Sequence, residues 1–381
     1  MPTTGSSPGR TTKGSNMTTV PTGTVATEEI TREELQLAAR NHGMPLEAMR
    51  YDVTPVGLHY LLVHYDIPVV DDATFRLGID GAVDTALSLS LDDLRARETV
   101  TRPVTMECAG NGRARLSPRA LSQPWLLEAV GTGEWTGTTL WPLLEDAGLS
   151  PDAVDIVFTG LDRGVEGGVE QAYQRSLTPQ QARDEGPLLV HGLNGGPLPP
   201  QHGFPLRLVV PGWYGMTSVK WLARITASAE PFTGYQQARA YRFRADPDDA
   251  GEPVTRMAVR SLMVPPGIPD FFTRARYLPP GHVTLTGRAW SGAGTIDRVE
   301  VSTDDGATWA DAELDTAVAD HAWQGWRFGW TADEGDHVVV CRATDSAGDT
   351  QPDEHRWNLG GYAVNTVHRV PVTVTAHPGG T

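Results

Sequence analysis

The sequence predicts two folded domains, an α+β domain over residues 29–250 and an all-β domain of immunoglobulin-like type over residues 251–381. Abundant Gly (41) and Pro (29) in 381 residues favour many turns and few long helices. Short apolar segments of mixed spacing fill the first part, and strictly alternating segments fill the second. A polar connector over residues 245–253 separates the two parts.

The first domain is predicted to mix short helices with short strands. Its opening elements are a helix within residues 29–50, strands over 57–65 and 75–81, and a helix over 90–97. Thr31 and Glu34 have the spacing of a capping box, and Ser90 is a suitable helix N-cap. Strands and helices then alternate between Gly- and Pro-rich loops to about residue 230, which is typical of an irregular α+β domain.

The second domain is predicted from alternation of apolar and polar residues. The alternating segments are residues 282–290, 296–302, 337–343 and 370–375. Asp304, Asp305 and Gly306 supply a turn after the second of them. Several short strands without a long helix indicate a β-sandwich. Cys341 lies inside one of these strands, so we expect it to be a core residue.

The charge balance excludes some classes of function. Lys and Arg number 31 against 47 Asp and Glu, which gives a formal net charge of −16 at pH 7. Because nucleic-acid binding needs a basic face, no nucleic-acid partner is expected. The sequence also contains no run of about 18 apolar residues, so no membrane span is expected.

The chain start and the cysteine content indicate a cytoplasmic protein. Residues 1–28 are rich in Thr, Ser, Gly and Pro, with no apolar signal segment and no twin-arginine pattern, and they predict a disordered tail. Cys108 and Cys341 are the only cysteines, which is no disulfide framework. A reduced, cytosolic chain is the simpler interpretation.

Residues 104–113 have the features of a ligand-binding loop. Val104 and Met106 alternate with polar neighbours, as at the end of a buried strand, and Gly110 and Gly112 permit a tight turn. Cys108 then stands where the strand gives way to the loop. A thiolate there suits a soft metal, and a following Arg keeps the local field positive. A small buried hydrophobe is the alternative interpretation of this cysteine.

A second stretch, residues 199–222, places cations at loop–strand junctions. The residues concerned are His202, Arg207, Ser218 and Lys220. Arg supplies forked donors and Lys a point charge, and backbone N–H groups bounded by glycine can add to them, so the group suits a phosphate. Taken alone, each is as readily an ordinary surface residue.

Together these stretches resemble the sulfite oxidase family, molybdenum enzymes whose single cysteine binds the metal of a molybdopterin cofactor. CAGN followed by Gly-Arg resembles the family's cysteine loop, and HGFPLR, VPG and SVKWL resemble its pterin-phosphate segment. The later GRAWSG, RVEVS and WNLGG resemble its C-terminal dimerisation domain. The resemblance implies a sulfite-oxidase-type molybdopterin-binding domain, a homodimer, and no haem, with electrons exchanged with an external redox partner.

The resemblance also implies a set of site residues. Cys108 is the metal ligand, and Arg113 and Tyr241 share the catalytic pocket with it. The residues implied to bind the cofactor are His64, Tyr65, Cys108, Asp162, His202, Arg207, Ser218, Val219 (through its backbone) and Lys220. Trp125 and Trp135 match family tryptophans near the pocket, although a core role is equally consistent for Trp135.

Two arginines of the family's sulfite pocket are missing from the aligned positions. The family's Arg-Asn-His triplet aligns with residues 62–64, which places Leu62 at the arginine, and its Trp-Asn-Leu-Arg-Gly signature places Gly360 at the second. Arg40 begins an Arg-Asn-His triplet, but it lies 35 residues before Phe75 rather than 13, so we interpret it as a helix-end residue. Losing two cations beside a small dianion would cost on the order of several kcal/mol of binding.

Three hypotheses for function follow. The first is a molybdopterin-dependent oxidoreductase whose substrate is not sulfite, such as an S-oxide or N-oxide, with Tyr241 donating a hydrogen bond to the transferring oxygen. The second is a genuine sulfite oxidase in which Arg115 or Arg119 replaces the missing charge. The third is a catalytically silent scaffold, against which the intact Cys108 and the cations around Arg207 argue.

Overall fold

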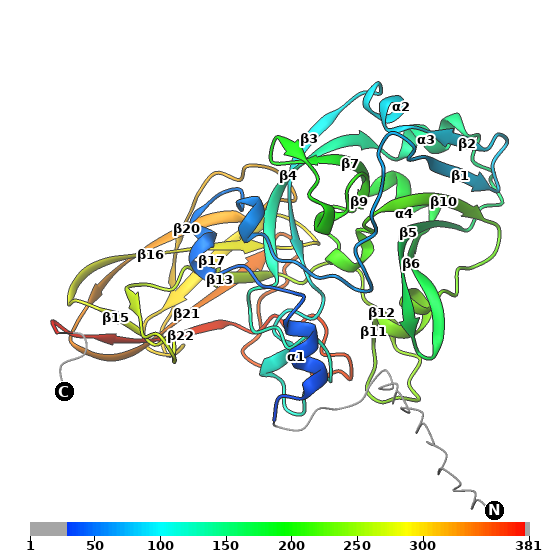
Figure 1. The fold of residues 1–381 in the computed structure, drawn as a ribbon. Coiled ribbons are helices and arrows are strands. Elements are labelled where there is room, and N and C mark those ends of the chain that lie inside the picture. Colours follow the sequence, from blue (N-terminus) through cyan, green and yellow to red (C-terminus); the bar gives the residue numbers. More distant parts are fainter. Residues whose placement is uncertain (1–28, 378–381) are drawn as a thin grey trace, which may run out of the picture.

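The computed structural model describes residues 29–377, so the tail predicted over residues 1–28 lies outside the described residues. Two lobes lie side by side, a mixed lobe and a lobe built of sheets (Figure 1). The described chain ends at the far end of the second lobe. This arrangement is the predicted α+β domain followed by a β-sandwich.

Two sheets form the first lobe. In one, the strand order is β2-β1-β10-β5-β6, with β1 and β10 parallel and the other neighbours antiparallel. Its strands are β1 (Leu77–Gly81), β2 (Leu87–Leu89), β5 (Asp155–Glu166), β6 (Val169–Leu177) and β10 (Leu222–Ser228). The other is antiparallel, in the order β3-β4-β7-β8, with β9 also paired to β7. Its strands are β3 (Val100–Glu107), β4 (Val130–Thr139), β7 (Leu188–Leu193), β8 (Gly196–Pro197) and β9 (Arg207–Val209).

The helices of the first lobe are short, as predicted. They are α1 (Arg32–Ala38), α2 (Leu91–Arg95), α3 (Trp141–Asp146) and α4 (Pro179–Asp184). Thr31 and Glu34 form a reciprocal capping box at α1, and Ser90 and Asp93 form another at α2, because each pair satisfies backbone N–H groups that the helix leaves free. Within the described residues, no helix has the length and apolar character needed to cross a membrane.

The second lobe is a sandwich of two sheets. The first has the order β13-β16-β20-β19, and the second has the order β14-β15-β22-β21-β17-β18. The strands are β13 (Arg260–Met263), β14 (Ile268–Pro269), β15 (Arg276–Leu278), β16 (Gly281–Trp290), β17 (Ile296–Ser302), β18 (Ala310–Asp311), β19 (Glu313–Leu314), β20 (Gln324–Ala332), β21 (Gly335–Asp345) and β22 (His368–Val374). The four alternating segments are therefore confirmed as strands.

Details of the sandwich also agree with the sequence. Cys341 lies on β21 in the core between the sheets and is fully buried. The predicted turn follows β17, where Asp305 has a φ of 57° and Gly306 a φ of 87°. Glycine adopts such angles freely and Asp tolerates them better than most residues, which accounts for both residues in the turn.

The strand predicted over residues 57–65 is wrong. Val56–Leu58 forms a single 3₁₀ turn, and the remainder is irregular apart from one bridge between Leu61 and His42. Side chains take the place of a neighbouring strand here: Asn41 Oδ1 accepts from Val63 N–H at 2.7 Å, and Lys220 Nζ donates to the Leu62 carbonyl at 2.7 Å. Tyr60, Leu61 and Leu62 of this segment line a cavity.

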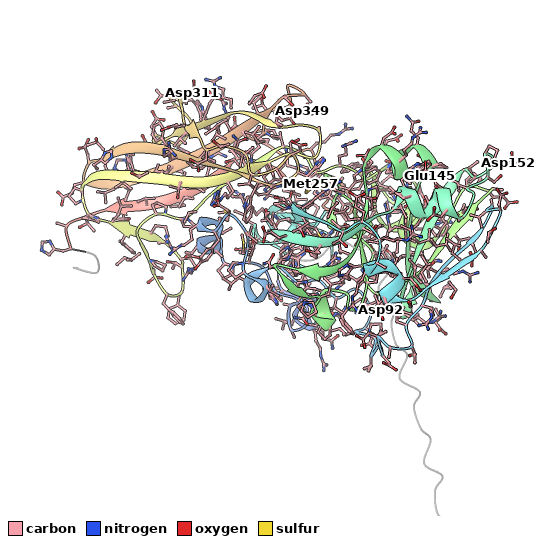
Figure 2. All side chains as sticks on the ribbon, turned by 90° about the horizontal axis from the view of Figure 1, so that it is seen from above. Asp92, Glu145, Asp152, Met257, Asp311 and Asp349 are labelled. Carbon is pink, nitrogen blue, oxygen red and sulfur yellow. The ribbon has the colours of Figure 1, made fainter. Side chains whose placement is uncertain are left out.

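An apolar cluster joins the two lobes. Met257 lies between them, whereas acidic residues stand on the outer surface (Figure 2). Tyr214 and Tyr241 of the first lobe share this cluster with Leu262 and Trp290 of the second. The division that the sequence predicts near residue 250 falls in the loop between two short paired strands, β11 (Arg242–Phe243) and β12 (Glu252–Pro253).

Candidate active site

Cys108 is the first residue after β3, where the sequence places the change from strand to loop. It is buried, with 8 % of its surface exposed. Gly112 has a φ of 96°, and a Cβ added at Gly110 would stand 2.5 Å from an Arg113 guanidinium nitrogen. Gly110 is therefore needed for space and Gly112 for conformation, and the turn brings Arg113 back beside Cys108.

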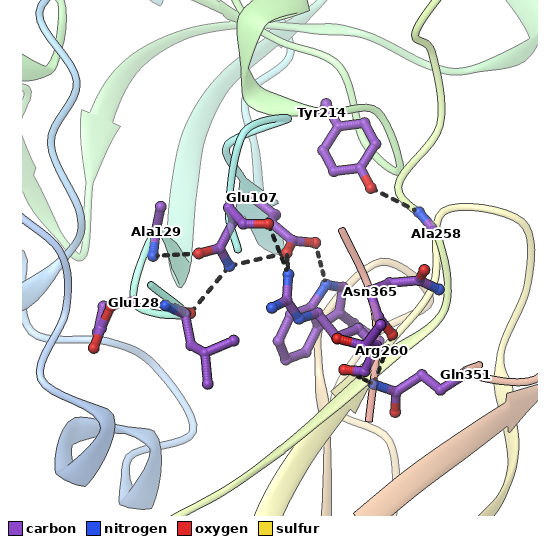
Figure 3. Close-up of polar contacts among 12 residues, drawn as sticks. Glu107, Glu128, Ala129, Tyr214, Ala258, Arg260, Gln351 and Asn365 are labelled. Carbon is purple, nitrogen blue, oxygen red and sulfur yellow. Dashed lines mark hydrogen bonds and ion pairs between the residues drawn. The ribbon is translucent and has the colours of Figure 1, made fainter. Parts of the chain in front are cut away.

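The residue before the cysteine is held by a buried polar network (Figure 3). Glu107 accepts hydrogen bonds from Arg260 at 2.5 Å, Trp290 Nε1 at 2.9 Å and Asn111 Nδ2 at 3.0 Å. Arg260 and Trp290 are register partners on β13 and β16 of the second lobe. Asn111 also donates to the Leu127 carbonyl, and its Oδ1 accepts from Ala129 N–H. The second lobe therefore fixes the backbone on which Cys108 stands.

A cationic cradle lies on one side of Cys108. We define the cradle as the cavity lined mainly by His59, Tyr60, Leu62, His64, Met106, Cys108, Asp162, Tyr173, His202, Arg207, Met216, Ser218, Lys220 and Tyr241. Arg207 donates to the carbonyls of His202 and Ser218 and stacks over the Trp135 ring, 4.8 Å from its centroid. Lys220 donates to the carbonyls of Leu62 and Gln201. The two cations are thus anchored by backbone oxygens rather than by acids.

The electrostatics of the cradle indicate an anionic ligand. Among residues 29–377, neither Arg207 nor Lys220 forms an ion pair with a carboxylate. Burial, together with Arg207 nearby, lowers the pKa of Lys220 to about 7, and burial lowers the pKa of Arg207 to about 10. Burial likewise lowers the pKa of His202 to about 2 and raises that of Asp162 to about 6. A phosphate in the cradle would supply the missing counter-charge, so the donor set fits a phosphorylated cofactor.

A second, larger cavity of about 350 Å³ opens on the other side of Cys108. Leu62, His64, Cys108 and Tyr241 line both cavities, so the thiol stands on their shared wall. Burial raises the pKa of the Cys108 thiol, against the opposing effect of Arg113. Burial also holds the pKa of Tyr241 well above its usual value, so its hydroxyl remains a hydrogen-bond donor at neutral pH.

Arginines dominate the wall of the larger cavity. Arg40, Arg113, Arg239, Arg242 and Arg244 line it together with Leu62 and Gly360. Arg40 ends the turn after α1, as interpreted from the sequence, and it also lines this cavity, which the sequence left open. The bridge between His42 and Leu61 folds its segment back against Leu62.

An arginine, Arg244, also lies close to Gly360, and both residues line the larger cavity. The N–H of Leu359, the neighbour of Gly360, donates to the Arg244 carbonyl at 2.8 Å.

The two replacement cations considered from the sequence do not line the cavity. Arg115 is exposed, and Arg119 pairs with the buried Glu34 at 2.8 Å. The cavity therefore does carry positive charge in place of the two missing family arginines, but the residues that supply it are not the replacements proposed from the sequence.

One carboxylate, Glu166, is among the residues that line the larger cavity. It accepts hydrogen bonds from His64 Nε2 at 2.8 Å, Tyr65 OH at 3.0 Å and Gln236 Nε2 at 2.7 Å. Burial raises the pKa of Glu166, but the bonds from His64, Gln236 and Tyr65 outweigh it and leave the pKa below its usual value. Glu166 is thus ionised, and its hydrogen bonds hold the side chains of His64 and Gln236 in place on this wall of the cavity.

Most of the predicted site residues are brought together. His64, Asp162, His202, Arg207, Ser218 and Lys220 line the cradle with Cys108 and Tyr241, and Arg113 lines the larger cavity. Tyr65 faces the larger cavity instead of the cradle. Val219 reaches neither cavity: it is fully buried, its N–H donates to Thr217 O, and its carbonyl accepts from Leu208 N–H. Trp125 lines the larger cavity, and Trp135 is a core residue beneath Arg207.

Several lining residues were not found from the sequence. His59, Tyr60 and Tyr173 contribute to the cradle, and Glu166 and Gln236 to the larger cavity. Gln236 and Arg239 lie on a π-helical turn, Gln236–Ala240, a rare conformation that often occurs at functional sites. These residues belong to no motif, so spacing gave no signal for them.

Comparison with known proteins agrees with this geometry. Residues 64–236 match the model of the oxidoreductase molybdopterin binding domain, and residues 252–375 match that of the Mo-co oxidoreductase dimerisation domain. The chain is 36 % identical to the sulfite oxidase of Gallus gallus over 338 residues, which cover 83 % of this chain and 72 % of that protein. The chain belongs to the sulfite oxidase family.

Other family members extend the comparison. The mitochondrial sulfite oxidase of Mus musculus is 34 % identical over 347 residues, 84 % of this chain, and the match spans 62 % of that protein's length. The sulfane dehydrogenase SoxCD of Paracoccus pantotrophus has a similar structure, with a TM-score of 0.76 and 25 % identity over 88 % of this chain and 86 % of that one. The family therefore accounts for both lobes, and its molybdopterin-binding model covers most of the cradle residues.

Proposed function

We propose that this protein is a molybdenum-cofactor-dependent enzyme that transfers an oxygen atom at a metal bound by Cys108. The observation that carries the proposal is the position of the thiol, on the wall shared by a cationic cradle and a cavity lined by arginines. The cradle suits the phosphate of the pterin, and the cavity suits a substrate. A silent scaffold has no need for a soft thiolate at that junction.

Each residue has a defined part in this proposal. His202, Arg207, Ser218 and Lys220 would hold the phosphate, and Asp162 and His64 would contact the pterin. The bound molybdenum cofactor supplies the oxygen-atom transfer chemistry. Tyr241 keeps its proton and would donate a hydrogen bond to the oxygen being transferred, while Arg113 would face the substrate.

The cavity supports an anionic substrate. The hypothesis of a neutral S-oxide or N-oxide depended on the loss of cations at Leu62 and Gly360, and arginines from neighbouring segments line the same wall. The relatives named sulfite oxidase make sulfite the first compound to test. We also propose that electrons pass to an external acceptor, and that two copies pair through residues 252–375.

The test combines molybdenum content with turnover. In a host that makes the cofactor, Cys108→Ser should lower sulfite-dependent reduction of an artificial electron acceptor at least about 100-fold, since metal ligands matter at least as much as their supporting residues. Cys341→Ser is the matched control, because Cys341 is an equally buried thiol far from both cavities and contacts the hydroxyl of Ser261.

The outcomes separate the hypotheses. Molybdenum with robust sulfite turnover in the wild type and Cys341→Ser, but not in Cys108→Ser, supports the proposal. Molybdenum without sulfite turnover, but with reduction of S-oxides or N-oxides, would favour a neutral substrate. A well-folded wild type that takes up no molybdenum would contradict the proposal and favour the scaffold.

A further inference from the structure

The larger cavity holds more positive charge than a small oxyanion requires. Its five arginines come from three segments of the chain, around residues 40, 113 and 239–244, and among the described residues none of them pairs with a carboxylate. Three buried arginines of the second lobe do form such pairs: Arg260 with Glu107, Arg276 with Glu47 and Arg288 with Asp52. The chain has an excess of acids, so five unpaired arginines around one cavity form a specific feature.

These arginines lie at different depths. Arg113 is 5 % exposed in the cysteine loop, and its guanidinium donates to the carbonyls of Gly360 and Gln123. Arg242 and Arg244 are half-buried. Arg40 and Arg239 are exposed, at the solvent edge of the cavity. Positive charge therefore extends from beside Cys108 to the rim, rather than surrounding one point.

The size of the cavity agrees with an extended ligand. A four-atom oxyanion occupies roughly 120 Å³, at the volume of about 30 Å³ that a water molecule takes in the liquid. The cavity measures about 350 Å³ and leaves room beyond such an ion. An ion at Arg113 would leave the rim arginines without a partner.

We propose that the natural substrate is an extended anion with two oxyanion groups, one at the end formed by Cys108, Arg113 and Tyr241, and the second held at the rim by Arg40 and Arg239. The inference rests on the proposed function and goes beyond it by naming the class of substrate. Glu166, engaged with His64, Tyr65 and Gln236, also lines the cavity and disfavours a third negative group beside it.

Binding to the holoprotein tests this inference without turnover. The probes are sulfate, a compact dianion, and propane-1,3-disulfonate, an extended dianion of the same charge, titrated by calorimetry at about 0.15 M ionic strength, where exposed charges are screened beyond roughly 8 Å. The disulfonate should bind at least tenfold more tightly than sulfate. The double variant Arg40→Gln/Arg239→Gln should reduce that preference to less than threefold and leave sulfate affinity within a factor of two.

Arg32→Gln is the matched control, since Arg32 is also exposed, also near α1, and outside the cavity. It should leave both affinities unchanged. Equal affinity for the two dianions, or an equal loss for both in the double variant, would overturn the inference. Robust sulfite turnover with no disulfonate preference would contradict this inference alone, whereas tight disulfonate binding in a protein without turnover would contradict the proposed function alone.

Discussion

The two cavities that meet at Cys108 differ in how they hold their cations. In the cradle, Arg207 and Lys220 are fixed by backbone carbonyls within 3.2 Å, and burial lowers the pKa of both. In the larger cavity, Arg40 and Arg239 are exposed and have no carboxylate partner in the described chain. The first arrangement is pre-organised for one permanent ligand, and the second leaves side chains free to adapt to a ligand that comes and goes.

The largest expected effect is the loss of molybdenum when a cation of the cradle is removed. Arg207→Gln removes a buried cation and should lower the molybdenum content of purified protein more than tenfold, because a charge-assisted contact to phosphate is lost in a site that excludes water. Arg239→Gln, in the larger cavity, is the comparison and should keep full molybdenum content. Metal analysis with circular dichroism as a folding control decides this. Equal loss from both variants would mean that the two cavities do not have separate roles.

The next effect concerns pH. In protein without cofactor, the pKa of Lys220 is about 7 when folded and near 10.5 when unfolded, so between these values the unfolded state binds one more proton. Stability should therefore rise with pH from 7 to 9, by at most about 1.4 kcal/mol per pH unit. Bound phosphate should keep Lys220 protonated and remove the slope.

Urea unfolding at pH 7, 8 and 9 measures this dependence. Lys220→Met without cofactor should lack the rise that the wild type shows, because it carries no titrating amine at this position. The same rise in Lys220→Met as in the wild type would assign the dependence to other groups and contradict the account of the cradle given above.

The smallest expected effect is a change in the KM for an anionic substrate when Glu166, a carboxylate that lines the larger cavity, is neutralised. Glu166→Gln removes a negative charge from the wall while an amide can still accept the bonds from Tyr65 and His64. The KM for an anionic substrate should fall two- to fivefold, a modest change because the cavity is partly screened by solvent. Steady-state kinetics at two ionic strengths checks it, and a higher KM would mean that Glu166 acts mainly by orienting His64.

The sequence predicts the two regions unequally, for a physical reason. The cradle residues His202, Arg207, Ser218 and Lys220 belong to one continuous stretch, so a local pattern places them together. The arginines of the larger cavity come from distant segments, and only tertiary folding brings Arg40 against Leu62. Separation along the chain argued against Arg40, but a chain reversal makes such separation a poor guide to distance.

Local errors have a similar origin. Residues 57–65 read as a strand because they are apolar, yet Asn41 and Lys220 satisfy backbone groups that a neighbouring strand would otherwise pair. Val219 follows the motif but lies behind the cavity wall, with its backbone already bonded. By contrast, the capping boxes at Thr31 and Ser90 and the alternation of β16 and β21 depend on neighbouring residues alone, so they were predictable.

The ion pair between Arg260 and Glu107 limits how freely one lobe can be replaced while the other is kept. Neither lobe can be exchanged for a foreign one without leaving a charge buried and unmatched, at a cost of about 3–5 kcal/mol. A gene fusion that replaced residues 252–375 would therefore disturb the loop that carries Cys108, although no residue of that loop had changed. The two lobes are therefore coupled through this ion pair, even though their sequences read as separate modules.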